Sequence, residues 1–264
     1  MIQPYYQDDT VTLYNADCLD VMREMEAESV DIIWTDPPYG HNNNNNDLIH
    51  RVERAIPSRR AKGDDGTAEY EARPIINDGP EEMRAVMDGM LIEAARVLRQ
   101  DCCCCCCCGG GGPKTTFAWV ANRMDEKGLS FFHAVIWDKG GLGMGWRYRR
   151  NYEMVMVAHR RGGKLKWETT SSGIDTANVV RIPKIIPTAI DHPTPKPVAL
   201  PLHFLALHGK AGDVVLDPFM GAGPTGVASV NWDCRFIGIE LEEKYCEIAK
   251  RRIIEAKSQL RLAI

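Results

Sequence analysis

The chain has no long hydrophobic run, no secretory leader and no excess of basic residues. None of its apolar stretches approaches the roughly 20 residues that a membrane-spanning helix needs. The first nine residues, Met1 to Asp9, have neither a basic start nor an apolar core. Acidic residues outnumber basic ones by 36 to 32, so any contact with a polyanion must come from local patches. These absences predict a cytoplasmic protein with no membrane partner.

The cysteines lack the spacing of a disulfide framework or of a metal site. Seven of the ten form one block, Cys102 to Cys108. Because neighbouring residues along a strand point to opposite faces, such a block cannot present a set of ligands to one ion. A free cysteine behaves as a small hydrophobic residue. We therefore predict a buried strand with reduced thiols and no bound metal.

The apolar periodicity that is present predicts strands alternating with helices. Strands are expected at 11–18, 29–34, 102–108, 131–137, 152–159, 213–216 and 235–239, and helices at 19–25, 81–99, 117–127, 198–208, 227 onward and 242–260. This alternation is typical of an α/β fold, a doubly wound, mostly parallel sheet with helices on both faces. We predict one domain over 1–264, with a long insertion at 41–80 that begins with an asparagine run.

A rigid turn follows the strand expected at 29–34. It reads Asp36-Pro37-Pro38-Tyr39. Neither proline can donate a ladder hydrogen bond, and both restrict the backbone as it leaves the strand. The turn therefore holds one carboxylate, exposed carbonyls and one ring in a fixed relation, which suits a planar group that bears an amine. The alternative is a proline-rich turn with no ligand.

A glycine-rich turn follows the strand expected at 213–216. Gly221, Gly223 and Gly226 have the spacing G-x-G-x-x-G, and Glu240 closes the next strand. In a doubly wound fold this combination binds a nucleotide-like ligand, with the acid on the ribose hydroxyls. Asp217, at the mouth of the turn, would repel a pyrophosphate and attract a cationic sulfonium or ammonium group. S-adenosylmethionine is thus favoured over NAD, and an unliganded turn is the alternative.

The stretch from residue 146 to residue 167 is basic and aromatic. It contains seven arginines or lysines and one acid, a composition that suits phosphate contact and base stacking. The alternative is a solvated basic face beside a core strand. The candidate DNA contacts are Trp146, Arg147, Tyr148, Arg149, Arg150, Arg160, Arg161, Lys164 and Lys166.

These motifs, in this order, resemble those of amino-group DNA methyltransferases of the permuted β group. Asp36 to Tyr39 resembles the D-P-P-Y motif, Asp217 to Gly223 resembles the cofactor loop D-P-F-x-G-S-G, and His192 to Pro197 resembles the preceding H-P-T-x-K-P segment. The resemblance covers most of the chain, apart from 41–80 and parts of 160–190. Ala222 and Pro224 depart from the usual serine and threonine of the loop, whereas Thr225 keeps the second threonine.

The resemblance implies transfer of a methyl group from S-adenosylmethionine to an exocyclic amine of a flipped base in double-stranded DNA. Adenine N6 is favoured over cytosine N4. Asp36 and the Pro37 carbonyl would accept the amino hydrogens, and Tyr39, held by Pro38, would stack on the base. A small subregion at about 160–192 would recognise the target sequence. The implied cofactor residues are Asp17, Thr194, Lys196, Asp217, Pro218, Phe219, Gly221, Gly223, Thr225 and Glu240.

Other functions fit fewer of these residues. A nicotinamide-dependent dehydrogenase gives no role to Asp36 through Tyr39. RNA or protein methyltransferases of this type usually carry Asn at the position of Asp36. A non-catalytic DNA-binding module needs no acid-lined cofactor loop. The chain also has no Pro-Cys dipeptide of the kind that cytosine-C5 enzymes use. A homodimer and a cognate restriction enzyme are further candidate partners.

Overall fold

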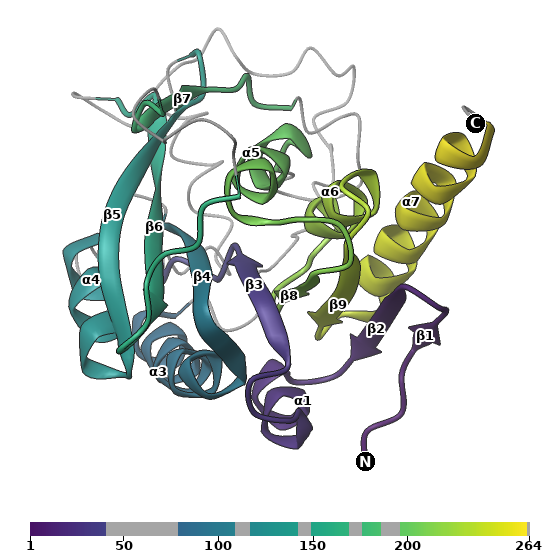
Figure 1. Ribbon diagram of the computed structural model, residues 1–264, viewed down its shortest axis with the longest axis horizontal. Coiled ribbons are helices and arrows are strands. Elements are labelled where there is room, and N and C mark those ends of the chain that lie inside the picture. Colours follow the sequence, from purple (N-terminus) through teal and green to yellow (C-terminus); the bar gives the residue numbers. More distant parts are fainter. Residues whose placement is uncertain (41–78, 109–116, 142–148, 169–175, 186–195, 263–264) are drawn as a thin grey trace, which may run out of the picture.

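The computed structural model describes residues 1–40, 79–108, 117–141, 149–168, 176–185 and 196–262. This part of the chain forms one nine-stranded sheet with helices packed on both faces (Figure 1). The strands are β1 (Tyr6–Gln7), β2 (Val11–Asn15), β3 (Val30–Thr35), β4 (Leu98–Cys108), β5 (Leu129–Asp138), β6 (Tyr152–Arg160), β7 (Val179–Arg181), β8 (Val214–Asp217) and β9 (Arg235–Glu240). The helices are α1 (Cys18–Glu24), α3 (Pro80–Val97), α4 (Phe117–Glu126), α5 (Ala199–His208), α6 (Pro224–Asn231) and α7 (Glu243–Leu262).

The sheet has the order β1-β2-β9-β8-β3-β4-β6-β5-β7 and is mostly parallel. Strands β2, β9, β8, β3 and β4 run parallel, so their carboxyl ends meet at one edge. Strand β6 is antiparallel to both of its neighbours, β4 and β5, and β1 is antiparallel to β2. The predicted doubly wound α/β fold is confirmed. In the described residues no helix lies between β5 and β6, and these two strands pair antiparallel. A strict alternation of strands and helices would not contain such a pair.

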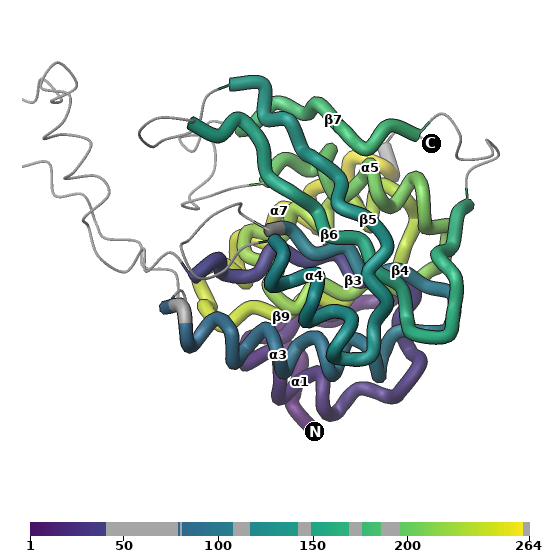
Figure 2. Tube along the Cα trace, turned by 90° about the vertical axis from the view of Figure 1, so that its left-hand side faces the viewer, coloured from purple at the N-terminus to yellow at the C-terminus, as the bar shows by residue number. Residues whose placement is uncertain are grey.

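Two groups of helices cover the two faces of the sheet. On one face α3 packs on β4, α4 packs on β5 and β6, and α1 packs against α3 and β9; on the other face α5, α6 and α7 pack over β3, β8 and β9 (Figures 1 and 2). On the second face the ring of Trp34 packs against Phe204 of α5 at 4.8 Å between centroids. The site must therefore lie at the rim of the sheet, since both of its faces are filled.

The cysteine block lies in a strand, as predicted, and forms the last seven residues of β4. Cys102 to Cys107 are all buried and free. Cys103, Cys105 and Cys107 face the core beneath α5, whereas the alternate cysteines face the core beneath α3. Burial raises the pKa of the Cys104, Cys105 and Cys107 thiols well above its usual range, so these side chains serve as small apolar fillers.

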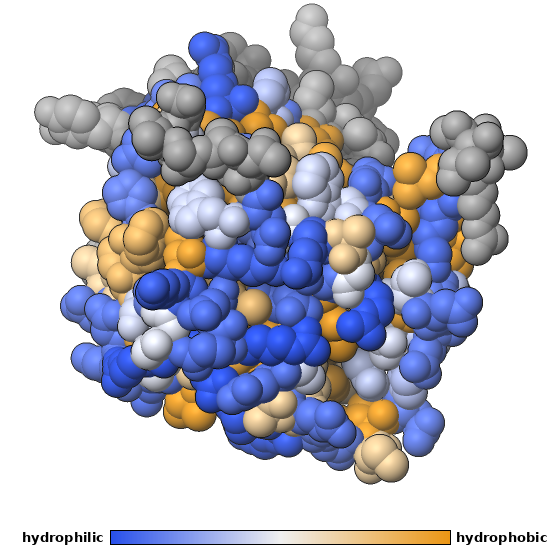
Figure 3. Space-filling model, viewed as in Figure 1, coloured by the Kyte–Doolittle hydropathy of each residue, from blue (hydrophilic) through white to orange (hydrophobic). Residues whose placement is uncertain are grey.

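The surface view of Figure 3 is mainly hydrophilic, with hydrophobic residues in separate small patches. Isolated hydrophobic residues are normal on a protein surface. In the part of the chain that the structure describes, no helix is long and apolar enough to cross a bilayer. Most of the predicted insertion, including its asparagine run, lies outside the described residues.

Candidate active site

The turn that follows β3 places Asp36 at the carboxyl edge of the parallel strands. Thr35 and Pro37 on either side are buried, whereas the Asp36 side chain keeps 24% of its surface exposed. Strand β8 is the neighbour of β3, with Ile33 opposite Leu216, and ends at Asp217. The proline-rich turn and the glycine-rich turn, far apart in the sequence, therefore lie at adjacent strand ends.

Two side chains hold the Asp36 carboxylate. The Lys196 ammonium lies 2.8 Å from Oδ2 of Asp36, and the Tyr39 hydroxyl donates a hydrogen bond to Oδ1. Burial raises the pKa of Asp36, and the charge of Lys196 opposes that rise. Lys196 also donates to the Tyr39 hydroxyl at 3.1 Å. The predicted turn residues thus form one hydrogen-bonded unit with a lysine that lies 160 positions further along the chain.

A second carboxylate, Glu153 of β6, extends this unit. Its Oε2 lies 3.3 Å from the Lys196 ammonium, and its Oε1 lies 2.9 Å from the ammonium of Lys139 at the end of β5. Although burial favours the neutral acid, Lys196 and Lys139 together lower the pKa of Glu153. Glu153 belongs to Asn151-Tyr152-Glu153, which resembles a segment near the target base in DNA amino-methyltransferases, whereas Lys139 was not expected at the site. The local signal for Lys139 is its position just after β5, beside the basic stretch.

The glycine-rich turn between β8 and α6 has the geometry that a nucleotide-like cofactor needs. Gly221 and Gly223 have positive φ angles of 49° and 75°. A Cβ atom on Gly223 would lie 2.8 Å from the Cβ of Ala249 in α7, so the close approach of α6 to α7 requires glycine. Pro224 begins α6, where its missing N–H costs no helical hydrogen bond. The turn fits the cofactor that the sequence indicates.

Glu240 and Asp17 lie at the neighbouring strand ends. The Glu240 carboxylate accepts the N–H groups of Gly221 at 3.0 Å and Glu242 at 2.9 Å, which fixes it beside the glycine turn. Asp17 caps α1 by accepting the Leu19 N–H at 2.8 Å, and the adjacent Ala16 N–H donates to the Glu240 carbonyl. The structure therefore brings both predicted acids to the rim where the turn opens.

Asp217 lies beneath the turn that it was expected to line. It is buried, and its carboxyl group accepts the Thr225 hydroxyl at 2.5 Å and the Phe219 N–H at 3.1 Å. Burial raises the pKa of Asp217 to about 7, and these two hydrogen bonds oppose the rise. Asp217 and Thr225 thus shape the loop from inside, and Pro218 is buried with them.

The predicted DNA contacts divide into three groups. Thr194 of the cofactor set, and Trp146, Arg147 and Tyr148 of the DNA set, lie outside the described residues. Arg149 and Arg150 precede β6 at the end where Met154 pairs with Cys108, which is the edge that carries Asp36. The remaining four, Arg160, Arg161, Lys164 and Lys166, lie at or beyond the other end of β6.

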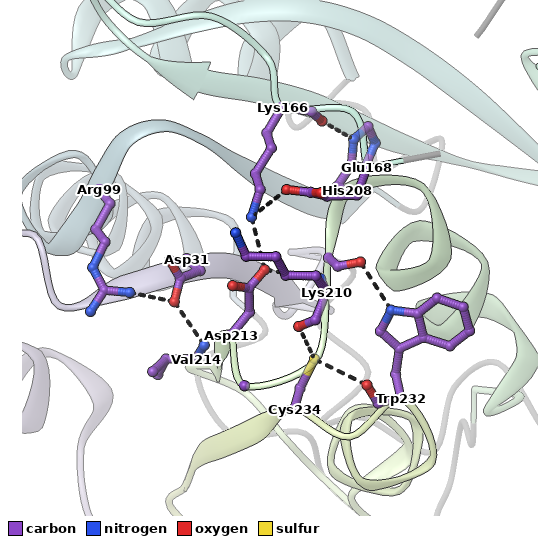
Figure 4. A network of polar contacts seen from close by, with 12 residues as sticks. Asp31, Arg99, Lys166, Glu168, His208, Lys210, Asp213, Val214, Trp232 and Cys234 are labelled. Atoms are coloured by element: carbon purple, nitrogen blue, oxygen red, sulfur yellow. Dashed lines mark hydrogen bonds and ion pairs between the residues drawn. The ribbon is translucent and has the colours of Figure 1, made fainter. Parts of the chain in front are cut away.

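Arg160, Arg161, Lys164 and Lys166 lie at the opposite edge of the sheet. Because β6 is antiparallel to β4, its far end returns to the amino ends of the parallel strands. There Arg160 forms an ion pair with Glu28, and the Lys164 N–H donates to Asp101 at 2.6 Å. The Lys166 ammonium lies 2.9 Å from Asp213 and 3.0 Å from Glu168 (Figure 4). The structure therefore divides the predicted basic stretch between the two ends of β6.

Comparison with known proteins identifies relatives along nearly the whole chain. A sequence model of the N6/N4 DNA methylases matches residues 30–251. The Type II methyltransferase M2.MboI of Moraxella bovis is 25% identical, over 96% of this chain and 92% of its own. M2.DpnII of Streptococcus pneumoniae is 26% identical, over 98% and 95%.

Solved structures share the fold. The M1.HpyAVI-SAM complex superposes with a TM-score of 0.64 at 22% identity, covering 92% of this chain and 98% of that one. PvuII DNA methyltransferase, described as cytosine-N4-specific, superposes with a TM-score of 0.70 at 17% identity, covering 98% and 95%.

Proposed function

Because the chain belongs to the N6/N4 DNA methylase family, we propose that it methylates the N6 amino group of adenine in double-stranded DNA. It is an S-adenosylmethionine-dependent DNA amino-methyltransferase, and the finer choice of base is what the proposal adds. Aspartate at position 36 supports adenine, since the resemblance implies that cytosine-N4 enzymes more often carry serine there. Cytosine N4 is the second candidate.

The observation that carries the proposal is the juxtaposition of two strand ends. Asp36 follows β3, and the glycine turn follows the adjacent β8. A base amine at Asp36 and a methyl donor on the glycine turn would therefore meet at one rim. Positioning of this kind replaces an encounter in solution with a reaction between aligned partners.

The residues at this rim can activate an exocyclic amine. Such an amine is a poor nucleophile because its lone pair is delocalised into the ring. Asp36 and the Pro37 carbonyl, fixed by the rigid turn, would accept its two N–H bonds and free the lone pair. When bound, S-adenosylmethionine supplies a methyl group on a positively charged sulfur. The amine forms its N–C bond as the S–C bond breaks, and Asp36 is the nearby carboxylate that can take the proton the methylated amine must lose.

The target base has to leave the helix to reach this rim. Base flipping gives an enzyme access to an atom that is buried inside a duplex, and an aromatic side chain stacks on the extruded base. We assign the stacking role to Tyr39. Arg149 and Arg150, at the same edge, are the described residues proposed to contact phosphate. The Type II names of the relatives support a restriction enzyme as a cognate partner, and a homodimer is proposed from the resemblance alone.

A transfer assay tests the function. Purified protein is incubated with labelled S-adenosylmethionine and duplex DNA of mixed sequence, with RNA and protein substrates in parallel. Label is expected in DNA, and Asp36→Ala is expected to abolish it. Nucleoside analysis of the product should show N6-methyladenine. Label found only in RNA or protein, or an Asp36→Ala variant as active as the wild type, would reject the function, whereas N4-methylcytosine would reject only the choice of base.

A further inference from the structure

Lys196 lies at the base side of the site, although the sequence resemblance assigned it to the cofactor pocket. Its ammonium contacts Asp36 at 2.8 Å, Glu153 at 3.3 Å and the Tyr39 hydroxyl at 3.1 Å. It also lies 5.2 Å from the centre of the Tyr39 ring and 5.9 Å from that of Trp137. None of these partners belongs to the glycine turn.

We propose that Lys196 is a positioning residue for the target amine, and that Lys196 and Glu153 together set the orientation and charge of Asp36. This inference rests on the proposed function, in which Asp36 accepts the amino hydrogens. It assigns Lys196 to the base and not to the cofactor, and it gives Glu153 a role in the reaction.

The exposures of the two side chains show how Lys196 can act without blocking the base. The Asp36 side chain is 24% exposed, whereas that of Lys196 is only 9% exposed. Lys196 is therefore the more deeply buried of the two, and part of the Asp36 side chain stays open to an incoming base. Each carboxylate oxygen can accept more than one hydrogen bond, so the amine and the ammonium can share Asp36.

Four charges of alternating sign make this arrangement stable. Asp36, Lys196, Glu153 and Lys139 follow one another at 2.8, 3.3 and 2.9 Å and come from four different segments of the chain. Burying a charge without a partner costs roughly several kcal/mol. Pairing each charge with one of opposite sign avoids this cost. Although burial opposes the charged form, Asp36 and Glu153 raise the pKa of Lys196, so this lysine stays cationic. Because Glu153 also balances the charge of Lys196, Asp36 can still accept hydrogen bonds from a base.

Lys196 and Glu153 act on Asp36 in opposite directions. Burial raises the pKa of Asp36, Lys196 lowers it, and Glu153 raises it again. Removal of the lysine charge should therefore raise the pKa of Asp36 further, and removal of the glutamate charge should lower it. The other titratable groups that face this cluster stay in place in both cases: Tyr39, Cys107, Lys139 and Asp217.

The test compares Lys196→Met, Lys196→Arg and Glu153→Gln with the wild type. Single-turnover methylation of duplex DNA is measured at saturating cofactor from pH 5 to pH 9, and cofactor affinity is measured separately by titration. Lys257→Met is the control, because Lys257 is also a partly buried lysine, 20% exposed and paired with Asp8 at 2.7 Å, but lies on α7. Thermal unfolding of each variant reports its stability.

Lys196→Met is expected to lower the rate by about 10²-fold, a typical loss for one preorganised electrostatic contact. The acid limb of its pH profile should move to higher pH, while cofactor affinity changes by less than about threefold, which is under 1 kcal/mol. Glu153→Gln should move the acid limb to lower pH. Lys196→Arg should recover much of the rate, and Lys257→Met should leave rate and profile unchanged. A merely structural role cannot move the limb in opposite directions.

Three outcomes would overturn the inference. One is a Lys196→Met variant that loses cofactor affinity but reacts normally at saturating cofactor. Another is a pH profile that moves in the same direction, or not at all, in both Lys196→Met and Glu153→Gln. If Lys196→Met does not fold, a Glu153→Gln variant with a wild-type profile overturns it equally. Wild-type transfer to DNA that depends on Asp36, measured first, separates these outcomes from a failure of the proposed function itself.

Discussion

Strand β3 carries an acid at each end, and the two acids are held in different ways. Asp31, near its start, accepts the Val214 N–H of β8 at 2.8 Å and forms an ion pair with Arg99 of β4 (Figure 4). Asp36, just past its end, is held by the side chains of Lys196 and Tyr39. Strand β8 also has an acid at each end, with Asp213 paired to Lys166 before its first residue and the buried Asp217 at its last.

The acids at the two ends of β3 differ in role: Asp31 supports the fold, and Asp36 is available for the reaction. The partners of Asp31 include the backbone of the neighbouring strand, so its interactions are part of the sheet. The partners of Asp36 are side chains, and its own side chain is twice as exposed, at 24% against 12%. An acid that is held by the backbone, like Asp31, stabilises the fold. An acid that is held by side chains and is more exposed, like Asp36, can still form hydrogen bonds with a substrate. Four predictions test this contrast, in order of decreasing effect.

The largest effect is expected from Asp36→Asn. This change removes the charge and one strong acceptor while keeping the shape, so the single-turnover rate should fall by about 10²–10³-fold. The free energy of unfolding, measured in urea, should change by less than about 1 kcal/mol because Lys196 retains Glu153 as a partner. A large loss of stability would show that Asp36 is a structural acid like Asp31.

Asp31→Ala should give the converse result. It leaves the buried Val214 N–H without an acceptor and Arg99 without its carboxylate, so the free energy of unfolding should fall by about 2–3 kcal/mol. The methylation rate per folded molecule should stay within about twofold of wild type, a difference of about 0.4 kcal/mol. Asp31→Asn is the matched control, because its side-chain oxygen can still accept the Val214 N–H and should recover part of the stability.

Cofactor affinity should depend on pH through Asp217. Burial raises the pKa of this acid to about 7, so it is neutral below that pH and charged above it. If the charged form attracts the cationic cofactor, affinity should weaken as pH falls through 7, by about tenfold between pH 8 and pH 6. Titration of the cofactor at several pH values measures this change. Asp217→Asn should show a flat profile, and an equal slope in both proteins would contradict the assignment.

The smallest effect concerns the two halves of the basic stretch. Arg150→Ala, at the Asp36 edge, should weaken DNA binding several-fold and reduce the slope of log affinity against log salt by about 1. Lys166→Met, at the Asp31 edge, should leave that slope unchanged and instead cost about 1 kcal/mol of stability, since its ammonium pairs with Asp213 and Glu168. Equal salt slopes in the two variants would show that both halves of the basic stretch contact DNA.

The sequence alone predicts those features whose cause is local. Strand β3 followed by two prolines, the glycine turn after β8 and the apolar cysteine block were all found where expected. The strand expected at 11–18 ends at Asn15, because Asp17 caps the next helix, and the helix expected from 227 begins at Pro224. These differences of a few residues arise where a cap decides the boundary.

The features that the sequence does not predict depend on distant contacts. The nine residues of β6 separate the two halves of the basic stretch by roughly 30 Å, at about 3.3 Å per residue, so neighbours in sequence lie at opposite edges. The reverse holds for Lys196, which meets Asp36 only because α5 packs over β3 and β4. Neither the separation of the two basic halves nor the contact between Lys196 and Asp36 has a sequence pattern that predicts it.

The cysteine strand has a consequence for how the chain finds its alignment. A strand is usually locked in place because sliding it by one position exposes its apolar side chains and buries its polar ones. In β4 a slide by one or two positions replaces cysteine with cysteine on both faces, so the middle of the strand carries no information about alignment. We infer that this information comes from its first residues, where Leu98 pairs with Val30 and Arg99 forms an ion pair with Asp31, ahead of a register shift that sets Ile32 opposite Cys103. Asp31, which takes no part in the reaction, would thereby decide which cysteine lies beside Asp36.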